Sequence, residues 1–138
     1  MRFAHLTVPT QHVERTASFL EQTLGCRRSV PPGNSPVETQ WLEIGDGRQL
    51  HVVYVEGFEA SPFEGEFGRH VAVVYPRLEF DAVKQRLIDR GADVFAPLRP
   101  TPFERFFFRD PVNGYVFEVI EERPGPGHRS PATWTNRT

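Results

Sequence analysis

The stretch RHVAVVYPRLEFDAVKQRLIDRGADV, residues 69–94, contains the unit from which the fold can be read. Residues 70–75 form a short apolar run typical of a strand, and Pro76 interrupts it. Apolar side chains then recur at helical spacing, at Phe80, Val83, Leu87 and Ile88. Gly91 comes next as a helix stop, because glycine adopts the left-handed conformation that ends many helices. The stretch therefore predicts a strand followed by an amphipathic helix.

The same order occurs once more, earlier in the chain. Residues 3–8 are a strand candidate, and Pro9-Thr10 is a plausible helix start. A helical stripe comes next at Val13, Ala17, Leu20 and Leu24, and Gly25 supplies its stop. His5 and His70 lie in the two opening runs, 20 and 21 residues before the glycine stops. The two halves thus begin alike.

The segments after the two helices are also alike. Two β-rich runs are joined by a turn cluster in each half, at residues 45–47 and 110–114. We expect the later strands at 26–30, 37–44 and 48–55 in the first half, and at 92–98, 103–109 and 115–121 in the second. Each half reads strand, helix, strand, strand, strand. A period of about 65 residues is longer than that of solenoid repeats and indicates duplication of one supersecondary unit.

These patterns predict a single domain over residues 1–122. Its modules are expected at 2–56 and 69–121, with a Gly-, Pro- and Glu-rich link at 57–68 that is a candidate flap. Residues 123–138 carry three Pro and almost no apolar periodicity, so we expect a flexible tail.

Composition excludes several classes of protein. The 138 residues carry a formal charge of −2, which gives no reason to expect nucleic acid or an anionic membrane as partner. Cys26 is the only cysteine, so neither an intrachain disulfide nor a thiolate metal cage can form. No apolar run approaches the length of a membrane span. We therefore expect a cytoplasmic protein with a small-molecule substrate.

Four residues with metal-binding side chains lie at matching places in the two halves. His5 and His70 lie in the first strands, while His51 and Glu118 each lie four residues after a turn glycine. Side chains alternate between the faces of a strand, so these four positions converge if the halves pack about a pseudo-twofold axis. Two His and a carboxylate hold Fe²⁺, Mn²⁺, Ni²⁺, Co²⁺ or Zn²⁺ and leave coordination positions open. For each residue alone, an ordinary core or surface role is the alternative interpretation.

The chain resembles the vicinal oxygen chelate superfamily, which includes glyoxalase I, fosfomycin-resistance proteins, bleomycin-resistance proteins and extradiol dioxygenases. The order and spacing of five pieces carry the resemblance: AHLTV at 4–8, LHV at 50–52, RHVAV at 69–73, RGADV at 90–94 and RDPVNGYVFEV at 109–119. The resemblance implies an α+β fold in which two βαβββ modules form a half-open mixed β-barrel around a metal site. It also implies a homodimer.

The resemblance further implies metal ligands at His5, His70 and Glu118, with His51 either a fourth ligand or a pocket residue. Two departures from the family pattern stand out. Asp110 precedes Glu118 by eight residues, where seven is usual, and we expect a bulge in the turn to absorb the difference. His51 stands where glyoxalase I has a carboxylate, which argues against glyoxalase I activity.

The favoured interpretation is a divalent-metal-dependent enzyme acting on a small oxygenated substrate. It would be an isomerase, a lyase, an epoxide-opening transferase or a dioxygenase. Thr7, which matches a pocket threonine of fosfomycin-resistance proteins, Arg105 and Phe107 are the candidate substrate-pocket residues. Arg99 and Arg109 are further candidates for an anionic substrate group. The alternative is a non-enzymatic protein that sequesters an aromatic drug, as in bleomycin resistance; members of that type generally lack the His/His/Glu set.

Overall fold

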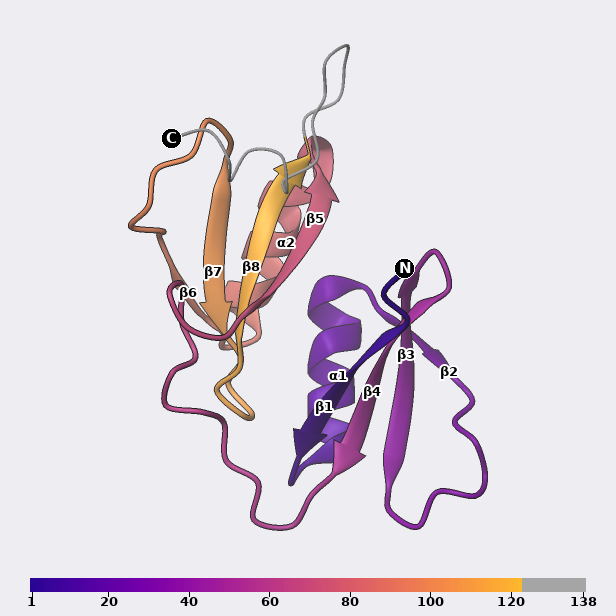
Figure 1. The fold of residues 1–138 in the computed structure, drawn as a ribbon. Helices are drawn as coiled ribbons and strands as arrows, with labels where there is room; N and C mark the ends of the chain where they lie inside the picture. Colours follow the sequence, from indigo (N-terminus) through magenta and orange to yellow (C-terminus); the bar gives the residue numbers. More distant parts are fainter. Residues whose placement is uncertain (123–138) are drawn as a thin grey trace.

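The computed structural model describes residues 1–122, which fold into two modules of the same element order (Figure 1). The first module comprises β1 (His5–Thr10), α1 (Val13–Leu24), β2 (Arg27–Ser29), β3 (Thr39–Gly45) and β4 (Arg48–Tyr54). The second comprises β5 (Val71–Pro76), α2 (Arg77–Asp89), β6 (Asp93–Phe95), β7 (Arg105–Arg109) and β8 (Val116–Glu122). The predicted tail at 123–138 lies outside the described residues.

Each module contains one four-stranded mixed sheet. The strand orders are β1-β4-β3-β2 and β5-β8-β7-β6, and in both sheets the first strand pairs in parallel with the last. The remaining pairs are antiparallel. The α+β fold with two βαβββ modules is confirmed. Within residues 1–122 of one chain the two sheets remain separate and open, so they do not close a barrel.

The predicted element boundaries hold to within a few residues. α1 ends at Leu24 because Gly25 takes the left-handed conformation (φ 78°) at the C-cap. Pro9 and Thr10 belong to β1 rather than to the start of α1. β1 is an edge strand, where a proline costs no ladder hydrogen bond if its nitrogen faces the free side.

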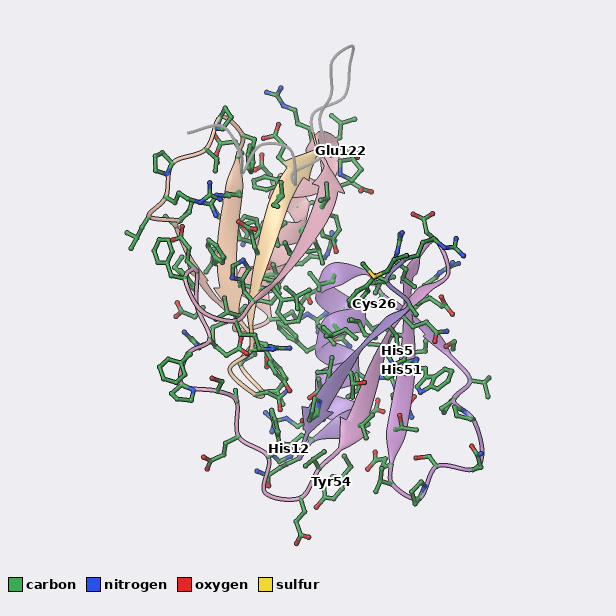
Figure 2. All side chains as sticks on the ribbon, in the orientation of Figure 1. His5, His12, Cys26, His51, Tyr54 and Glu122 are labelled. Atoms are coloured by element: carbon green, nitrogen blue, oxygen red, sulfur yellow. The ribbon has the colours of Figure 1, made fainter. Side chains whose placement is uncertain are left out.

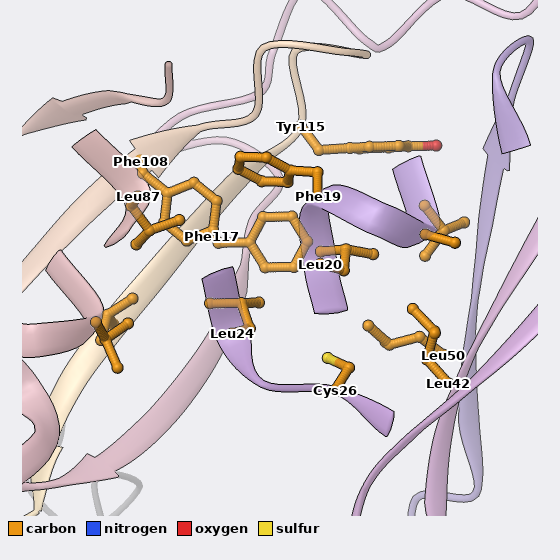
Figure 3. Packing of buried hydrophobic residues seen from close by; sticks show 14 of the residues in the cluster. Phe19, Leu20, Leu24, Cys26, Leu42, Leu50, Leu87, Phe108, Tyr115 and Phe117 are labelled. Atoms are coloured by element: carbon orange, nitrogen blue, oxygen red, sulfur yellow. The ribbon is translucent and has the colours of Figure 1, made fainter. Parts of the chain in front are cut away.

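One hydrophobic core joins the two modules. Phe19 and Leu20 of α1 are buried in the same cluster as Phe108 and Phe117 of the second sheet, as Figure 3 shows. The Phe19 and Phe108 rings lie 6.2 Å apart between centroids. α1 therefore packs against its own sheet and also against the helix-covered side of the other one. This arrangement fixes which faces of the sheets remain open.

Hydrogen bonds between the modules hold their relative orientation. The Tyr115 hydroxyl donates to the carbonyl of Pro9, and the Tyr75 hydroxyl donates to the carbonyl of Leu24. Burial raises the pKa of both tyrosines, so the phenols stay protonated and remain donors. Asn113 accepts a hydrogen bond from the Thr10 hydroxyl and donates one to the Thr16 hydroxyl.

Among residues 1–122, none of the helices is both long and apolar enough to span a bilayer.

Candidate metal centre

Sheet register makes the candidate ligands of the two modules equivalent. Thr7 is the parallel partner of His51, and His5 lies two residues before Thr7. Ala72 is the parallel partner of Glu118, and His70 lies two residues before Ala72. The neighbouring residues on β4 and β8 are buried against the helices: Leu50, Val52, Phe117 and Val119. His51 and Glu118 therefore occupy the opposite, open faces of their sheets.

His70 and Glu118 form a pair in the second module. Nε2 of His70 lies 3.9 Å from Oε1 of Glu118. Nδ1 of His70 lies 3.0 Å from the carbonyl oxygen of Gly65, which can only accept, so Nδ1 carries the proton. Nε2, the other ring nitrogen, is thereby directed toward Glu118. Phe107 packs edge-on against the imidazole, with 5.2 Å between ring centroids.

Arg105 neutralises the buried Glu118 carboxylate. Its Nη1 donates to Oε2 of Glu118 at 2.5 Å, and its Nη2 donates to Glu66 at 3.2 Å and to the carbonyl of Arg99. Only 2% of the Arg105 side chain is exposed. Its Nε is buried without a hydrogen-bond partner among the described residues. Because Arg105 uses Oε2, Oε1 of Glu118 is left for another partner.

Two carboxylates of the link at 57–68 hold it against the second module through hydrogen bonds. The buried Glu64 accepts hydrogen bonds from the Val116 amide at 2.8 Å and from Arg69 at 2.6 Å. Glu66 accepts from the amides of Leu98 and Arg99. Partial burial alone would raise the pKa of Glu66, but these amides and Arg105 outweigh it and lower the pKa.

His5 and His51 form a second pair, in the first module (Figure 2). Their rings stack with centroids 4.0 Å apart, and Trp41 stacks on the other side of His51 at 3.9 Å. Nε2 of His51 donates to the side-chain oxygen of Gln49 at 2.8 Å, and the Gln49 amide donates to Glu43. Burial, and then the nearby His5, lower the pKa of His51.

The two pairs do not meet in a single chain. Within residues 1–122 no group of three or more His, Cys, Asp or Glu side chains is arranged to hold a metal ion. The expected convergence of His5, His51, His70 and Glu118 therefore does not occur inside one chain. The reason is the placement of α1 between the modules: the helix-covered sides of the sheets face one another, so the open faces point apart (Figure 1).

A family model described as Glyoxalase/Bleomycin resistance protein/Dioxygenase superfamily matches residues 2–119. The chain belongs to this superfamily. A search of curated proteins gave no match.

Solved structures share the fold of this superfamily member. A putative glyoxalase family protein from Bacillus anthracis is 24% identical, with a TM-score of 0.70 over 89% of this chain and 96% of that one. The fosfomycin resistance protein FosX from Mesorhizobium loti is 21% identical, with a TM-score of 0.66 over 86% and 90%. A mutant FosX from Listeria monocytogenes, complexed with Mn(II) and 1S,2S-dihydroxypropylphosphonic acid, is 17% identical, with a TM-score of 0.70 over 87% and 91%.

The His70–Glu118 pair fits a divalent metal ion. Such ions lie about 2.0–2.2 Å from imidazole nitrogen and carboxylate oxygen. Two bonds of that length span the 3.9 Å between Nε2 and Oε1. The hydrogen bond from Nδ1 to Gly65 is the outer-shell contact that orients metal-binding histidines. The pair would supply two ligands, so a complete site would need at least one more.

The sequence-predicted pocket residues are distributed over both modules. Thr7 is exposed beside His51, while Phe107 and Arg105 lie at Glu118. The Arg109 guanidinium donates hydrogen bonds to the backbone carbonyls of Gly114 and Glu64, so these donors are already engaged within the protein. β7 and β8 pair without a register shift from Arg105 to Arg109, so the Asp110–Tyr115 turn accommodates the eight-residue spacing.

Two polar groups of the site were not found from the sequence: Glu66 and the carbonyl of Gly65. Both belong to the link, whose composition shows no strand or helix periodicity, so nothing in the pattern places them beside β8. The one available signal was the density of Gly and Glu in the segment that leads to His70, the residue before β5.

Proposed function

We propose that this protein is a metal-dependent enzyme of its superfamily, which acts on a small oxygenated substrate chelated to a divalent ion. His70, Glu118 and His5 are the proposed protein ligands. The observation that carries the proposal is the approach of Nε2 of His70 to Oε1 of Glu118, while the remaining polar atoms of both side chains are already hydrogen-bonded.

We further propose that a second copy of the chain supplies His5, in a homodimer. β1 and β5 are both edge strands, and a cleft of about 540 Å³ lies between them. Its apolar lining includes Phe3, which is 60% exposed, and Val74, which is 44% exposed. Exposed apolar edges of this kind favour association. A twofold-symmetric dimer would combine the two pairs twice and so form two sites.

The chain's own groups would bind and orient the substrate. A bound ion would polarise a substrate oxygen as a Lewis acid. Among residues 1–122, the buried Nε–H of Arg105 next to Glu118 has no hydrogen-bond partner, and it would suit a substrate oxygen. Phe107 excludes water on the side of His70. Thr7 adds a hydroxyl on the open face of the first sheet.

Metal binding by the protein purified without chelators tests the proposal. We expect about one Mn²⁺ per chain by calorimetry, and loss of at least about 100-fold in affinity for His70→Ala and Glu118→Gln. His12→Ala is the matched control, because His12 lies at the N-cap of α1 and makes no side-chain cap bond there. A wild-type protein that takes up none of Mn²⁺, Fe²⁺, Co²⁺, Ni²⁺ or Zn²⁺ would overturn the proposal.

Turnover of candidate substrates by the metal-loaded protein then decides the reaction class. Small epoxides carrying a phosphonate are the first substrates to test, since FosX structures are among the neighbours and one contains a dihydroxypropylphosphonic acid. Vicinal diols, hydroxy-carbonyl compounds and catechols represent the other reaction classes.

One observation favours the second candidate function, sequestration of an aromatic drug. The rings of His5, His51 and Trp41 form one aromatic stack on the open face of the first sheet, which a planar aromatic ligand could extend at its end. If this were the function, a planar aromatic ligand would bind equally well to wild type and to His70→Ala, with or without metal.

A further inference from the structure

Arg105 joins the candidate metal ligand Glu118 to the link that connects the two modules. It donates one hydrogen bond to Glu118 and another to Glu66, and its side chain is almost fully buried. The two carboxylates share one guanidinium, which carries a permanent positive charge. Arg105 and a divalent ion would therefore bind the same Glu118 carboxylate and would partly compete for its charge.

We propose that Arg105 is a positioning residue that sets the metal affinity of this site, and that Glu66 controls how strongly Arg105 competes with the ion for Glu118. The inference rests on the proposed metal-dependent function. By occupying Oε2, Arg105 directs Oε1 of Glu118 toward Nε2 of His70, so that the carboxylate would bind the ion through one oxygen.

Glu66 is held where it can fulfil this role. Its carboxylate accepts hydrogen bonds from the Leu98 amide at 2.7 Å and from the Arg99 amide at 3.0 Å, and only 8% of its side chain is exposed. Glu66 therefore holds a negative charge beside Arg105 whether or not an ion is bound. That charge offsets the repulsion that the guanidinium would otherwise exert on a nearby cation.

The arrangement predicts opposite effects for the two halves of the ion pair. Glu66→Gln retains an acceptor for the two amides but leaves Arg105 balanced only by Glu118, so affinity for Mn²⁺ should fall about 10–100-fold. Arg105→Met removes the competing cation and leaves two carboxylates facing the ion, so affinity should rise about tenfold or more. The double variant should return to within a few-fold of wild type, because the two charge changes cancel.

The test measures the dissociation constant of Mn²⁺ alone, by calorimetry, for wild type, both single variants and the double variant. Arg99→Met is the matched control for long-range charge, since the Arg99 contacts at this site come from its backbone. This control should change the affinity less than twofold to threefold, as expected of an exposed charge screened by salt. Circular dichroism and thermal unfolding establish that each variant is folded.

Weaker Mn²⁺ binding in both single variants would overturn the proposal. That result is expected if the Glu66–Arg105 pair only holds the link against the sheet, because either change would then disturb the site. Unchanged affinity in both would overturn it as well. If Arg105→Met does not fold, Arg105→Gln takes its place, with the same expected increase. Absence of Mn²⁺ binding in wild type would instead refute the metal-dependent function itself, so the two failures are distinguishable.

Discussion

The two histidines of the first module differ in what their ring nitrogens contact. Nε2 of His51 is hydrogen-bonded to the side-chain oxygen of Gln49, and the His51 ring is stacked between the rings of His5 and Trp41. Among the described residues, the His5 ring is stacked by His51 alone, and His5 is exposed. We therefore expect His51 to act as a platform for His5 rather than as a ligand.

Phenylalanine substitutions separate these roles, because a benzene ring preserves stacking and removes the ligand nitrogen. We expect His51→Phe to keep Mn²⁺ affinity within about tenfold of wild type. A tenfold loss is the smallest that is typical when a residue that supports a metal ligand is replaced. His5→Phe should abolish the high-affinity site. Calorimetric titration of both variants checks this, and equal losses would show that His51 also coordinates the ion.

Cys26 is the only cysteine of the chain, and its environment makes it unreactive. It is 6% exposed, and burial, with a smaller effect of Glu21, raises the pKa of its thiol to about 11. A raised pKa keeps the thiol protonated at pH 8 and lowers the thiolate fraction by about two orders of magnitude relative to a free cysteine. Iodoacetamide should therefore label the native protein at least about 100-fold more slowly than the protein in urea, as mass spectrometry can measure. Labelling at the same rate in both states would contradict the described burial.

At the level of the elements, the equivalence of the two halves was predictable from the sequence. The turn glycines Gly47 and Gly114 start the last strand of each half, so counting from them selects His51 and Glu118. Two-residue alternation then places both on one face of their sheets. The register confirms that equivalence, with Trp41 opposite His51 and Phe107 opposite Glu118.

Other parts of the site could not be predicted, for physical reasons. The packing of α1 decides which faces of the two sheets point toward each other. Phe19 has the same place in the helical pattern whichever module it contacts, so the sequence does not reveal this packing. The positions of Glu64 and Glu66 depend on individual hydrogen bonds to Val116, Leu98 and Arg99. No periodicity encodes such bonds, so only the structure locates them.

The link owes its shape to a close backbone approach at Gly68. A Cβ atom there would overlap the carbonyl oxygen of Phe63, which is also the acceptor for the Arg69 amide. Gly68→Ala must therefore open the turn and displace Gly65, the acceptor for His70. We expect a loss of about 1–3 kcal/mol in the free energy of unfolding, with a fall in Mn²⁺ affinity.

The matched control for this change is Gly65→Ala in the same turn. An added Cβ at Gly65 meets nothing within 4 Å, and its carbonyl remains available to His70. Urea unfolding and Mn²⁺ titration of the two variants check the prediction. Similar behaviour of the two alanine variants would show that the turn does not orient His70.

For the whole molecule, the proposed dimer predicts complementation between variants that are inactive alone. In a mixed dimer of His5→Ala and His70→Ala chains, one site receives both an intact His5 and an intact His70, and the other receives neither. After random exchange about half of the dimers are mixed, so about a quarter of the wild-type Mn²⁺ sites should return. Titration of the two proteins before and after co-refolding measures this, and no recovery despite mixed dimers would place His5 outside the site.

The separation of the two pairs by α1 also has a genetic consequence. If each site draws on two chains, a chain carrying both His5→Ala and His70→Ala would disable both sites of a dimer formed with a wild-type chain. Under random pairing, a cell that expresses wild type together with this double variant would retain about a quarter of its sites, rather than the half expected if each chain formed its own site. The placement of a single helix would thus determine whether a mutant allele is dominant.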